Sequence, residues 1–396
     1  MAHEKIDAAL ETFYSGNTAG AETALKEIGG GKLEPPAGLE PLDEAAYFEG
    51  IGGIRLAQED AAGAAKAFRK MIELEAKGEA EPNGHATSWA KLGEALAQAD
   101  ALDEAIEAFD KAVAMKKECA APTSSTLNVV YKYAECLFQN RKFKEAGEQF
   151  DDTIELASEA GADDATMATL VLYRAESIKH KIAPMLASVR VQKGMEGMAP
   201  PPQLAVLEKQ LEVESTEAIE LFRRAKELAE KAAMPEDFQL QIQRSMSETY
   251  HDAGRYVKGV MQRKKLIQMA EKQKVDPLDL GFMYHGLGES QREMGQIPES
   301  IDSYRKALSL KEKGEADKVS LAKTWYSMGE CLAGGNKWDA AIDAFTKARD
   351  LEETSQAEDE NHKVRLKKYW NTLGLALQAN GKEEEGKAAV EKAESL

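Results

Sequence analysis

Residues 89–96 read WAKLGEAL, and Ala105, Phe109 and Ala112 follow at fixed intervals. The same order of large and small residues returns between Trp325 and Ala348, and its first half returns a third time from residue 370. A pattern that recurs at a fixed period indicates a repeat array in which each copy is one structural unit. These anchors place the repeat starts near residues 2, 45, 86, 127, 168, 240, 281, 322 and 367, so the dominant period is 41 residues.

Each copy predicts two antiparallel helices joined by a tight turn, such as the one at Gly334–Asn336. Small residues at repeat positions 8 and 20 allow the helices to approach closely, and large residues fill the space between neighbours. One helix pair cannot bury its own apolar face, so the stack is the folding unit. We therefore expect Trp89, Trp325 and Trp370 to be mostly buried between helices.

This signature resembles the tetratricopeptide repeat, with a large residue at position 4, Leu at 7, Gly or Ala at 8, and Ala, Phe and Ala at 20, 24 and 27. The period exceeds the usual ~34 residues, and in that respect the array is similar to the long repeats of the kinesin light chain and of bacterial Rap-type regulators. The resemblance implies an all-α, right-handed superhelical solenoid of about nine helix–turn–helix repeats.

Four segments are predicted from the repeat spacing. They are a degenerate first repeat and linker (1–44), three acidic repeats (45–167), a fifth repeat with an insertion (168–239) and four further repeats (240–396). The insertion, residues 180–212, has helical patterns on both sides of a Gly/Pro-rich stretch, which predicts a long helical hairpin, with a disordered loop as the alternative. We expect an exposed apolar tip at Met195, Met198 and Leu204 that suits a protein contact.

The charge is uneven. Residues 1–164 hold 16 Lys and Arg against 32 Asp and Glu, a net charge of −16, whereas residues 165–396 hold 35 against 37, a net charge of −2. An acidic field repels phosphate backbones and anionic membranes and attracts basic partners. We therefore predict no nucleic-acid binding and no membrane insertion. Three widely spaced cysteines and the lack of an early apolar stretch suit the cytoplasm.

Motifs for phosphate, dinucleotide or zinc binding and for a nucleophilic serine are missing from the sequence, so no enzyme activity, cofactor or metal is predicted. The nearest approach to a metal site is a set of Glu–His pairs at helical spacing: Glu176/His180, Glu248/His251 and His285/Glu289. Such pairs are more often surface hydrogen bonds than ligands.

Glutamate occupies repeat position 9 in six successive copies, at Glu94, Glu135, Glu176, Glu248, Glu289 and Glu330. The family resemblance implies that this position lies on the concave face, where extended peptides bind. The alternative is that each glutamate is a structural partner of a neighbouring helix. Lys179 and Arg292 follow Glu176 and Glu289 by three residues and can neutralise them, whereas Glu94 and Glu135 have no such neighbour.

Other positions implied for the groove are Tyr131, Phe138, Tyr173, His285, Tyr326 and Asn371. Carboxylates interleaved with aromatic residues suit a basic, partly apolar peptide or partner protein. The cationic set by which chaperone adaptors hold a terminal carboxylate is missing, since the matching positions are Glu49, Gly53, Glu94 and Glu135. We therefore expect a non-enzymatic adaptor or scaffold. The alternative is a Rap-like regulator that senses a peptide and controls a partner by changing the pitch of the solenoid.

Overall fold

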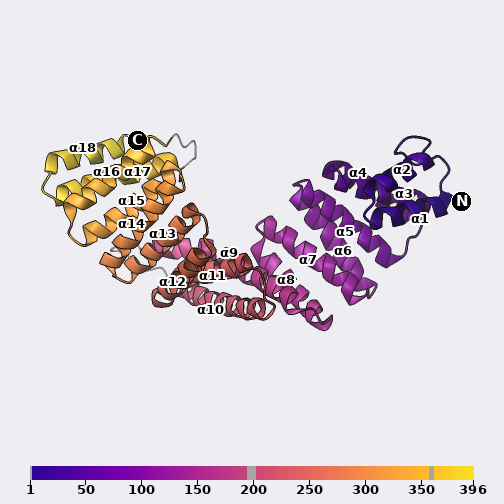
Figure 1. Ribbon diagram of the computed structural model, residues 1–396, viewed down its shortest axis with the longest axis horizontal. Coiled ribbons are helices and arrows are strands. Elements are labelled where there is room, and N and C mark those ends of the chain that lie inside the picture. Colours follow the sequence, from indigo (N-terminus) through magenta and orange to yellow (C-terminus); the bar gives the residue numbers. More distant parts are fainter. Residues whose placement is uncertain (1, 194–201, 356–360) are drawn as a thin grey trace. The chain divides into compact units, whose positions relative to one another are not determined.

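The computed structural model describes residues 2–193, 202–355 and 361–396. Every regular element in these residues is an α-helix, and the helices pack as consecutive pairs in a tetratricopeptide-like solenoid (Figure 1). The eighteen helices are α1 (Ala2–Tyr14), α2 (Thr18–Ile28), α3 (Pro41–Ala57), α4 (Ala61–Lys77), α5 (Pro82–Gln98), α6 (Leu102–Glu118), α7 (Thr123–Gln139), α8 (Phe143–Glu159), α9 (Asp164–Lys193), α10 (Pro202–Lys231), α11 (Glu236–Asp252), α12 (Tyr256–Gln273), α13 (Pro277–Glu293), α14 (Ile297–Lys313), α15 (Lys318–Gly334), α16 (Trp338–Glu353), α17 (His362–Ala379) and α18 (Glu383–Glu394). The all-α repeat prediction is confirmed.

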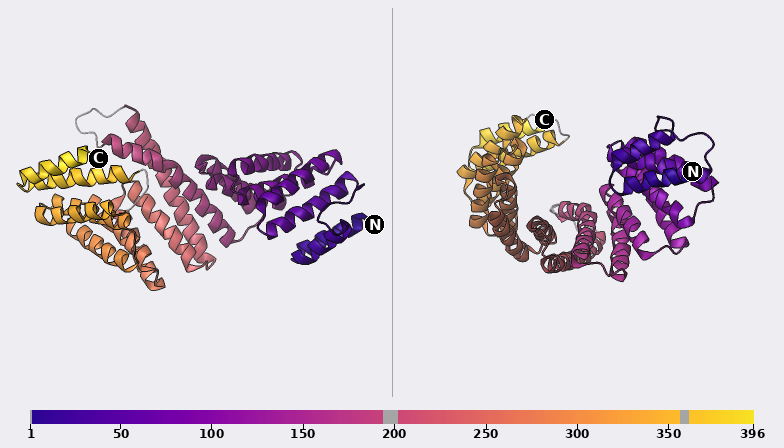
Figure 2. Two further views of the ribbon diagram at one scale, coloured as in Figure 1. Left: turned by 90° about the horizontal axis from the view of Figure 1, so that it is seen from above. Right: turned by 45° about the vertical axis from the view of Figure 1, so that its right-hand side comes forward.

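The chain forms two compact units, Met1–Pro184 and Met185–Leu396, called the first and second unit below. The odd-numbered helices are the first helices of their repeats and the even-numbered helices are the second. Within each unit the helices lie side by side in successive pairs (Figure 2). The four segments predicted from the repeat spacing stay a prediction.

Helix starts and ends follow local sequence. Asp60 and Asp317 cap α4 and α15 by accepting hydrogen bonds from the amides of Gly63 and Ser320, at 2.9 and 2.8 Å. Such caps satisfy amides that have no partner inside the helix. Asn336, in the predicted turn after α15, has a φ of 55°, a left-handed conformation that asparagine tolerates better than most residues. These signals fix where each helix pair turns.

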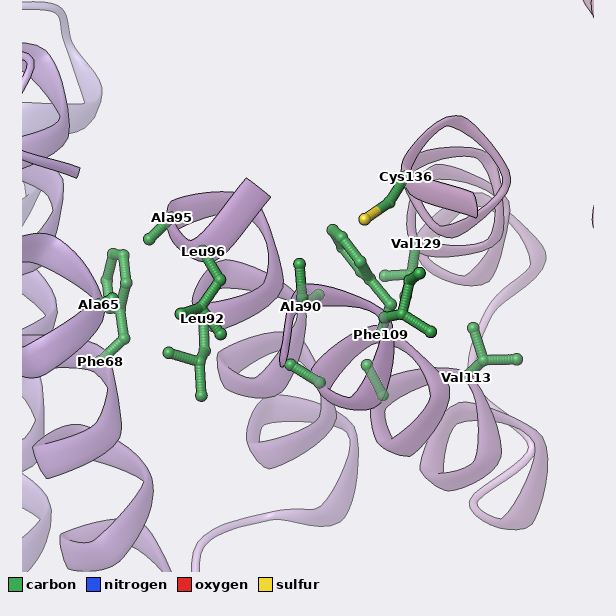
Figure 3. Close-up of a cluster of buried hydrophobic side chains, with 14 of the residues drawn as sticks. Ala65, Phe68, Ala90, Leu92, Ala95, Leu96, Phe109, Val113, Val129 and Cys136 are labelled. Atoms are coloured by element: carbon green, nitrogen blue, oxygen red, sulfur yellow. The ribbon is translucent and has the colours of Figure 1, made fainter. Parts of the chain in front are cut away.

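The core consists of aromatic rings that lie against small residues of the facing helix (Figure 3). Phe109 is 1% exposed, and a Cβ added at Gly93 would lie 3.0 Å from its ring. In the second unit the corresponding distance from Gly329 to the ring of Phe345 is 2.6 Å. The 2.6 Å contact leaves no room for a Cβ at Gly329, and the 3.0 Å contact at Gly93 is tighter than most Cβ contacts, so the close packing of the rings favours glycine at position 8 in both copies.

The tryptophans lie between helices, as expected. Trp89, Trp325 and Trp370 are partly buried, with most of each side chain covered, and they pack against the hydrophobic clusters of their units. A cation lies over each ring: Lys111 is 4.4 Å from the centroid of Trp89, Lys347 is 4.1 Å from that of Trp325, and Arg349 is 4.4 Å from that of Trp370. These cations cover ring surface that the neighbouring helices leave open.

The inserted hairpin is helical on both sides of the undescribed residues: α9 continues to Lys193 and α10 begins at Pro202. Leu204 is 6% exposed, so the expectation that it forms an exposed tip was wrong. It lies seven residues before Leu211, which is 5% exposed, and this spacing puts both on one buried face of α10. Met195 and Met198 lie outside the described residues.

Candidate first-helix binding faces

In the first unit, the position-9 glutamates lie on α5, α7 and α9, and the surface that these helices share is called the first-helix face. Lys132 Nζ, on α7, lies 2.7 Å from Glu94 Oε2 on α5. Glu94 has no cation on its own helix, as expected, but its charge is not free, because Lys132 comes from the next repeat, 38 residues away. Both side chains keep about a third of their surface in solvent, 29% for Glu94 and 31% for Lys132.

Glu135 is held by a neutral donor. The Tyr131 hydroxyl, one turn earlier on α7, donates to Glu135 Oε1 at 2.6 Å. Burial and this hydrogen bond together raise the pKa of Tyr131 above its ordinary value, so the phenol remains a donor at neutral pH. The Glu135 carboxylate is therefore oriented by a neutral hydroxyl.

Glu176 is buried, with 7% of its surface exposed. Lys179 Nζ and His180 Nε2 both lie 3.6 Å from Glu176 Oε2, so the predicted pairing with Lys179 is confirmed. Phe138 and Tyr173 lie nearby as a ring pair, with centroids 5.8 Å apart, and His180 packs 5.7 Å from Phe138. This end of the face is a packed aromatic and ionic cluster, which leaves little of Glu176 for a ligand.

A cavity of about 320 Å³ opens between α7, α8 and α9, beside Tyr131. Its lining contains no charged residue and consists of Ser124, Leu127, Asn128, Tyr131, Thr153, Thr166, Thr169 and Leu170. A site of this kind, mostly apolar with a few hydrogen-bonding groups, is typical of pockets that accept a side chain or small ligand. The first helices of this unit thus carry an uncharged cavity beside Tyr131 and the Glu94 and Glu135 carboxylates.

The second unit holds Glu248, Glu289 and Glu330 on α11, α13 and α15. Burial alone would raise the pKa of Glu289, but the hydrogen bond and charge of His285, with the charges of Arg263 and His251, lower it to about 2. His285 Nε2 lies 3.4 Å from Glu289 Oε1. Arg263 reaches this region from α12 and is 8% exposed. Glu289 is therefore part of an ionic network that reaches the buried Arg263, although 37% of its own side chain is exposed.

Arg292 pairs with Glu330, not with Glu289 as expected: Arg292 Nη1 lies 2.5 Å from Glu330 Oε2. Arg292 is three residues from Glu289 on α13, but the carboxylate of Glu330 on α15 is its ion-pair partner. The expectation that Arg292 neutralises Glu289 was therefore wrong. Glu248 contributes to the negative potential around Arg263.

The remaining predicted groove residues of the second unit are not equally accessible. Tyr326 is 7% exposed and stacks on Tyr369 with ring centroids 4.9 Å apart, so it is mainly a core residue. Its burial raises the pKa of its hydroxyl to about 12. Asn371 is exposed. His285 is only half-buried, but its Nδ1 atom is buried and accepts or donates no hydrogen bond among the described residues.

The sequence pattern missed several residues that define these faces. Lys91 and Lys132 are 41 residues apart and thus share a repeat position, and Lys91 pairs with Glu49 as Lys132 pairs with Glu94. The 41-residue spacing of these two lysines could have predicted that both pair with a glutamate of the preceding repeat. Small uncharged residues such as Thr153 and Thr169 carry no such signal, because they line a cavity that only the packing of three helices creates.

Within the described residues, no three His, Cys, Asp or Glu side chains are arranged to hold a metal ion. In the same part of the chain, no helix combines the length and the apolar character needed to cross a membrane.

Comparison with known proteins gives two matches to models of the tetratricopeptide repeat, at residues 86–119 and 279–353. No curated protein matches the chain in sequence. Among solved structures, a signal-transduction ATPase (STAND protein) with a tetratricopeptide repeat sensor from Pyrococcus horikoshii aligns with 98% of this chain and 50% of that chain, at 9% identity and a TM-score of 0.53. At this identity the likeness shows the fold alone.

Two smaller structures are also similar. BtubC from P. vanneervenii aligns at 16% identity with a TM-score of 0.48, covering 64% of this chain and 90% of that chain. The apo form of RapI aligns at 11% identity with a TM-score of 0.45, covering 79% of this chain and 98% of that chain.

Proposed function

Because the chain is a tetratricopeptide repeat protein, we propose that it is a non-catalytic adaptor whose first unit binds a basic, partly apolar peptide. Repeat arrays of this kind present extended surfaces that bind other proteins. The observation that carries the proposal is the uncharged cavity of about 320 Å³ beside Tyr131, whose hydroxyl donates to Glu135. An apolar side chain of the peptide enters the cavity, and flanking lysines or arginines contact Glu94 and Glu135.

Charge supports this choice of ligand. The net charge of −16 over residues 1–164 attracts a basic peptide and raises its rate of association at low salt. Lys132 competes with the ligand for Glu94, because it already pairs with that carboxylate. The three free cysteines suit a reducing compartment, and we place the protein in the cytoplasm.

The proposal is tested with a fluorescein-labelled nine-residue peptide that has a central leucine between two lysines on each side, measured by fluorescence anisotropy. Replacing Glu94 and Glu135 together by Gln is expected to weaken binding by about 1–3 kcal/mol, because two charge-assisted contacts become neutral. Glu289→Gln is the matched control in the second unit and is expected to leave the affinity unchanged.

Two further variants separate the cavity from the charges. Lys132→Met removes the competing cation and is expected to tighten binding. Thr169→Phe fills the cavity and is expected to weaken binding of the leucine peptide but not of a matched peptide with a central glycine. Equal affinity of all variants for the leucine peptide, with folding unchanged by circular dichroism, would show that this face is not the binding site.

A further inference from the structure

The second helix α12 is strongly basic in a chain that is acidic overall. Residues 255–274 contain seven Lys and Arg and one acidic residue, a net charge of +6, whereas the whole chain has a net charge of −18. Part of this charge is structural, since Arg263 is buried. The surface called the basic ridge below consists of the exposed Val257, Lys258, Met261, Lys264 and Lys265 on α12 and of the neighbouring Lys226 on α10, whose side chain is 22% exposed.

The ridge residues of α12 lie on the side of the helix opposite to its buried residues. Gly259, Val260, Leu266, Ile267 and Ala270 are buried and face one side. The exposed residues recur at intervals of three and four along the opposite side, which places them on one continuous strip. Val257 and Met261 are each 63% exposed and one turn apart, so the strip has an apolar part between its lysines.

Two lysines come close together from α10 and α12. Burial lowers the pKa of Lys226, and the positive charge of the nearby Lys265 lowers it further. Glu230 Oε1 is 3.6 Å from Lys226 Nζ and compensates part of this repulsion. In the described residues, no carboxylate lies within ion-pair distance of Lys258, Lys264 or Lys265.

Other junctions between consecutive second helices have opposite charges at the contact. Arg69 on α4 pairs with Glu104 on α6. Lys117 on α6 lies 3.2 Å from Asp152 on α8, and Lys306 on α14 lies 3.7 Å from Glu271 on α12. The α10/α12 junction departs from this arrangement, because it brings together two cations where an anion would stabilise both.

We propose that the basic ridge is a second binding surface, and that its ligand is an acidic protein segment with apolar side chains. The carboxylates of the segment contact Lys226 and Lys265, and its apolar residues cover Val257 and Met261. The ridge lies on second helices of the second unit, so it does not depend on the first-helix face of the first unit.

The composition of the ridge favours a protein ligand over phosphate polymers or a lipid surface. The ridge has no aromatic side chain for stacking on bases and no arginine for bidentate contacts to phosphate. A nucleic acid or a membrane would also extend beyond these few lysines and meet the acidic remainder of the chain. A short acidic segment interacts mainly with the local positive field.

The test uses the full-length protein and a fluorescein-labelled, amidated twelve-residue peptide of three Glu-Leu-Glu-Glu units, measured by fluorescence anisotropy. Binding is expected at about 50 mM NaCl and is expected to weaken by at least about tenfold at 300 mM, because the contacts are exposed and screened. Lys226→Glu with Lys265→Glu is expected to weaken binding at low salt by more than about tenfold.

The matched control is Lys313→Glu with Lys367→Glu, which changes the net charge by the same amount at exposed lysines of α14 and α17. It is expected to leave the affinity within about twofold of the unmodified protein, since long-range effects are screened. Val257→Ser with Met261→Ser is expected to weaken binding severalfold without changing its salt dependence, since it removes only apolar contact.

Two additional probes distinguish the ligand classes: a twenty-residue oligothymidylate, and vesicles with 30% phosphatidylserine in phosphatidylcholine. Tighter binding of either probe than of the acidic peptide would overturn the assignment to an acidic protein segment. Equal loss of peptide affinity in the control and ridge variants would overturn the ridge as the site. If the acidic peptide shows no detectable binding at low salt, the proposed ridge site is also overturned.

Discussion

The two units use the same repeat position for glutamate but place it in different electrostatic surroundings. In the first unit, Glu94 pairs with a partly exposed lysine and Glu135 accepts from a tyrosine. In the second unit, Glu289 belongs to a network with His285 and the buried Arg263, and its pKa falls to about 2. Position in the repeat therefore does not decide whether a carboxylate can meet a ligand.

The difference comes from the residues behind the first helices. Gly286 on α13 has no side chain, and a Cβ there would lie 1.6 Å from Nη1 of Arg263, so glycine is what allows the guanidinium to reach this surface. In the first unit the cavity occupies the space between α7 and α9, and its lining has no charge. We therefore expect Glu289 to stabilise the fold by offsetting the charge of the buried Arg263, and we propose that Glu94 and Glu135 contact a ligand.

The largest expected effect tests whether the two units respond separately to a loss of packing. Phe109 and Phe345 are 1% and 2% exposed, and each packs on the glycine at position 8 of its repeat. Changing either to Ala is expected to lower the free energy of unfolding by about 3–5 kcal/mol, because it leaves a cavity. Hydrogen exchange should show the loss of protection in the unit that carries the change.

Uniform loss of protection across both units after Phe109→Ala would contradict this separation. Phe109→Leu is the control, because it retains most of the apolar volume and is expected to cost less than half as much as Phe109→Ala.

A smaller effect tests the difference between the glutamates directly. The folded pKa of Glu289, about 2, lies below its ordinary value of 4.5, so Glu289 contributes stability above pH 4.5 that is lost as the pH falls toward 2. Because 37% of its side chain is exposed, screening reduces this contribution to about 1 kcal/mol. Glu289→Gln is expected to cost this amount at pH 7, and less than about half of it at pH 3.

Glu135→Gln is the comparison in the first unit and is expected to change the free energy of unfolding by less than about 0.5 kcal/mol. Urea unfolding at pH 7, 4 and 3 measures both variants. If the two substitutions cost the same at pH 7, the proposed division between structural and available glutamates is incorrect.

The sequence was sufficient to predict the repeats, the helix pairs and the helical hairpin, because these follow from spacing along one chain. Residues such as Phe109 and Gly93 recur with a period that a helix pair explains directly. The sequence was not sufficient to predict the partner of Glu94. That ion pair joins α5 to α7, and residue spacing within one helix does not reveal a cation on the first helix of the next repeat.

Burial at the ends of the pattern was also hard to predict. Leu204 was expected to be exposed at the tip of the inserted hairpin, but its spacing from Leu211 puts it in the buried seam of α10. Trp89 packs between helices as expected, but the cation over its ring was not predicted, because Lys111 lies on another helix.

The smallest expected effect compares two cation–π contacts of nearly equal geometry, one in each unit. Lys111 lies 4.4 Å from the ring centroid of Trp89 in the first unit, and Lys347 lies 4.1 Å from that of Trp325 in the second. Partly exposed cation–π contacts contribute about 0.5–1 kcal/mol. Changing either lysine to Met keeps most of the apolar chain and removes the charge, so each is expected to cost about 0.5 kcal/mol and to shift tryptophan fluorescence in its own unit. Unequal costs would mean that the units differ in their packing as well as in their buried charges, because the local geometry of the two contacts is nearly the same.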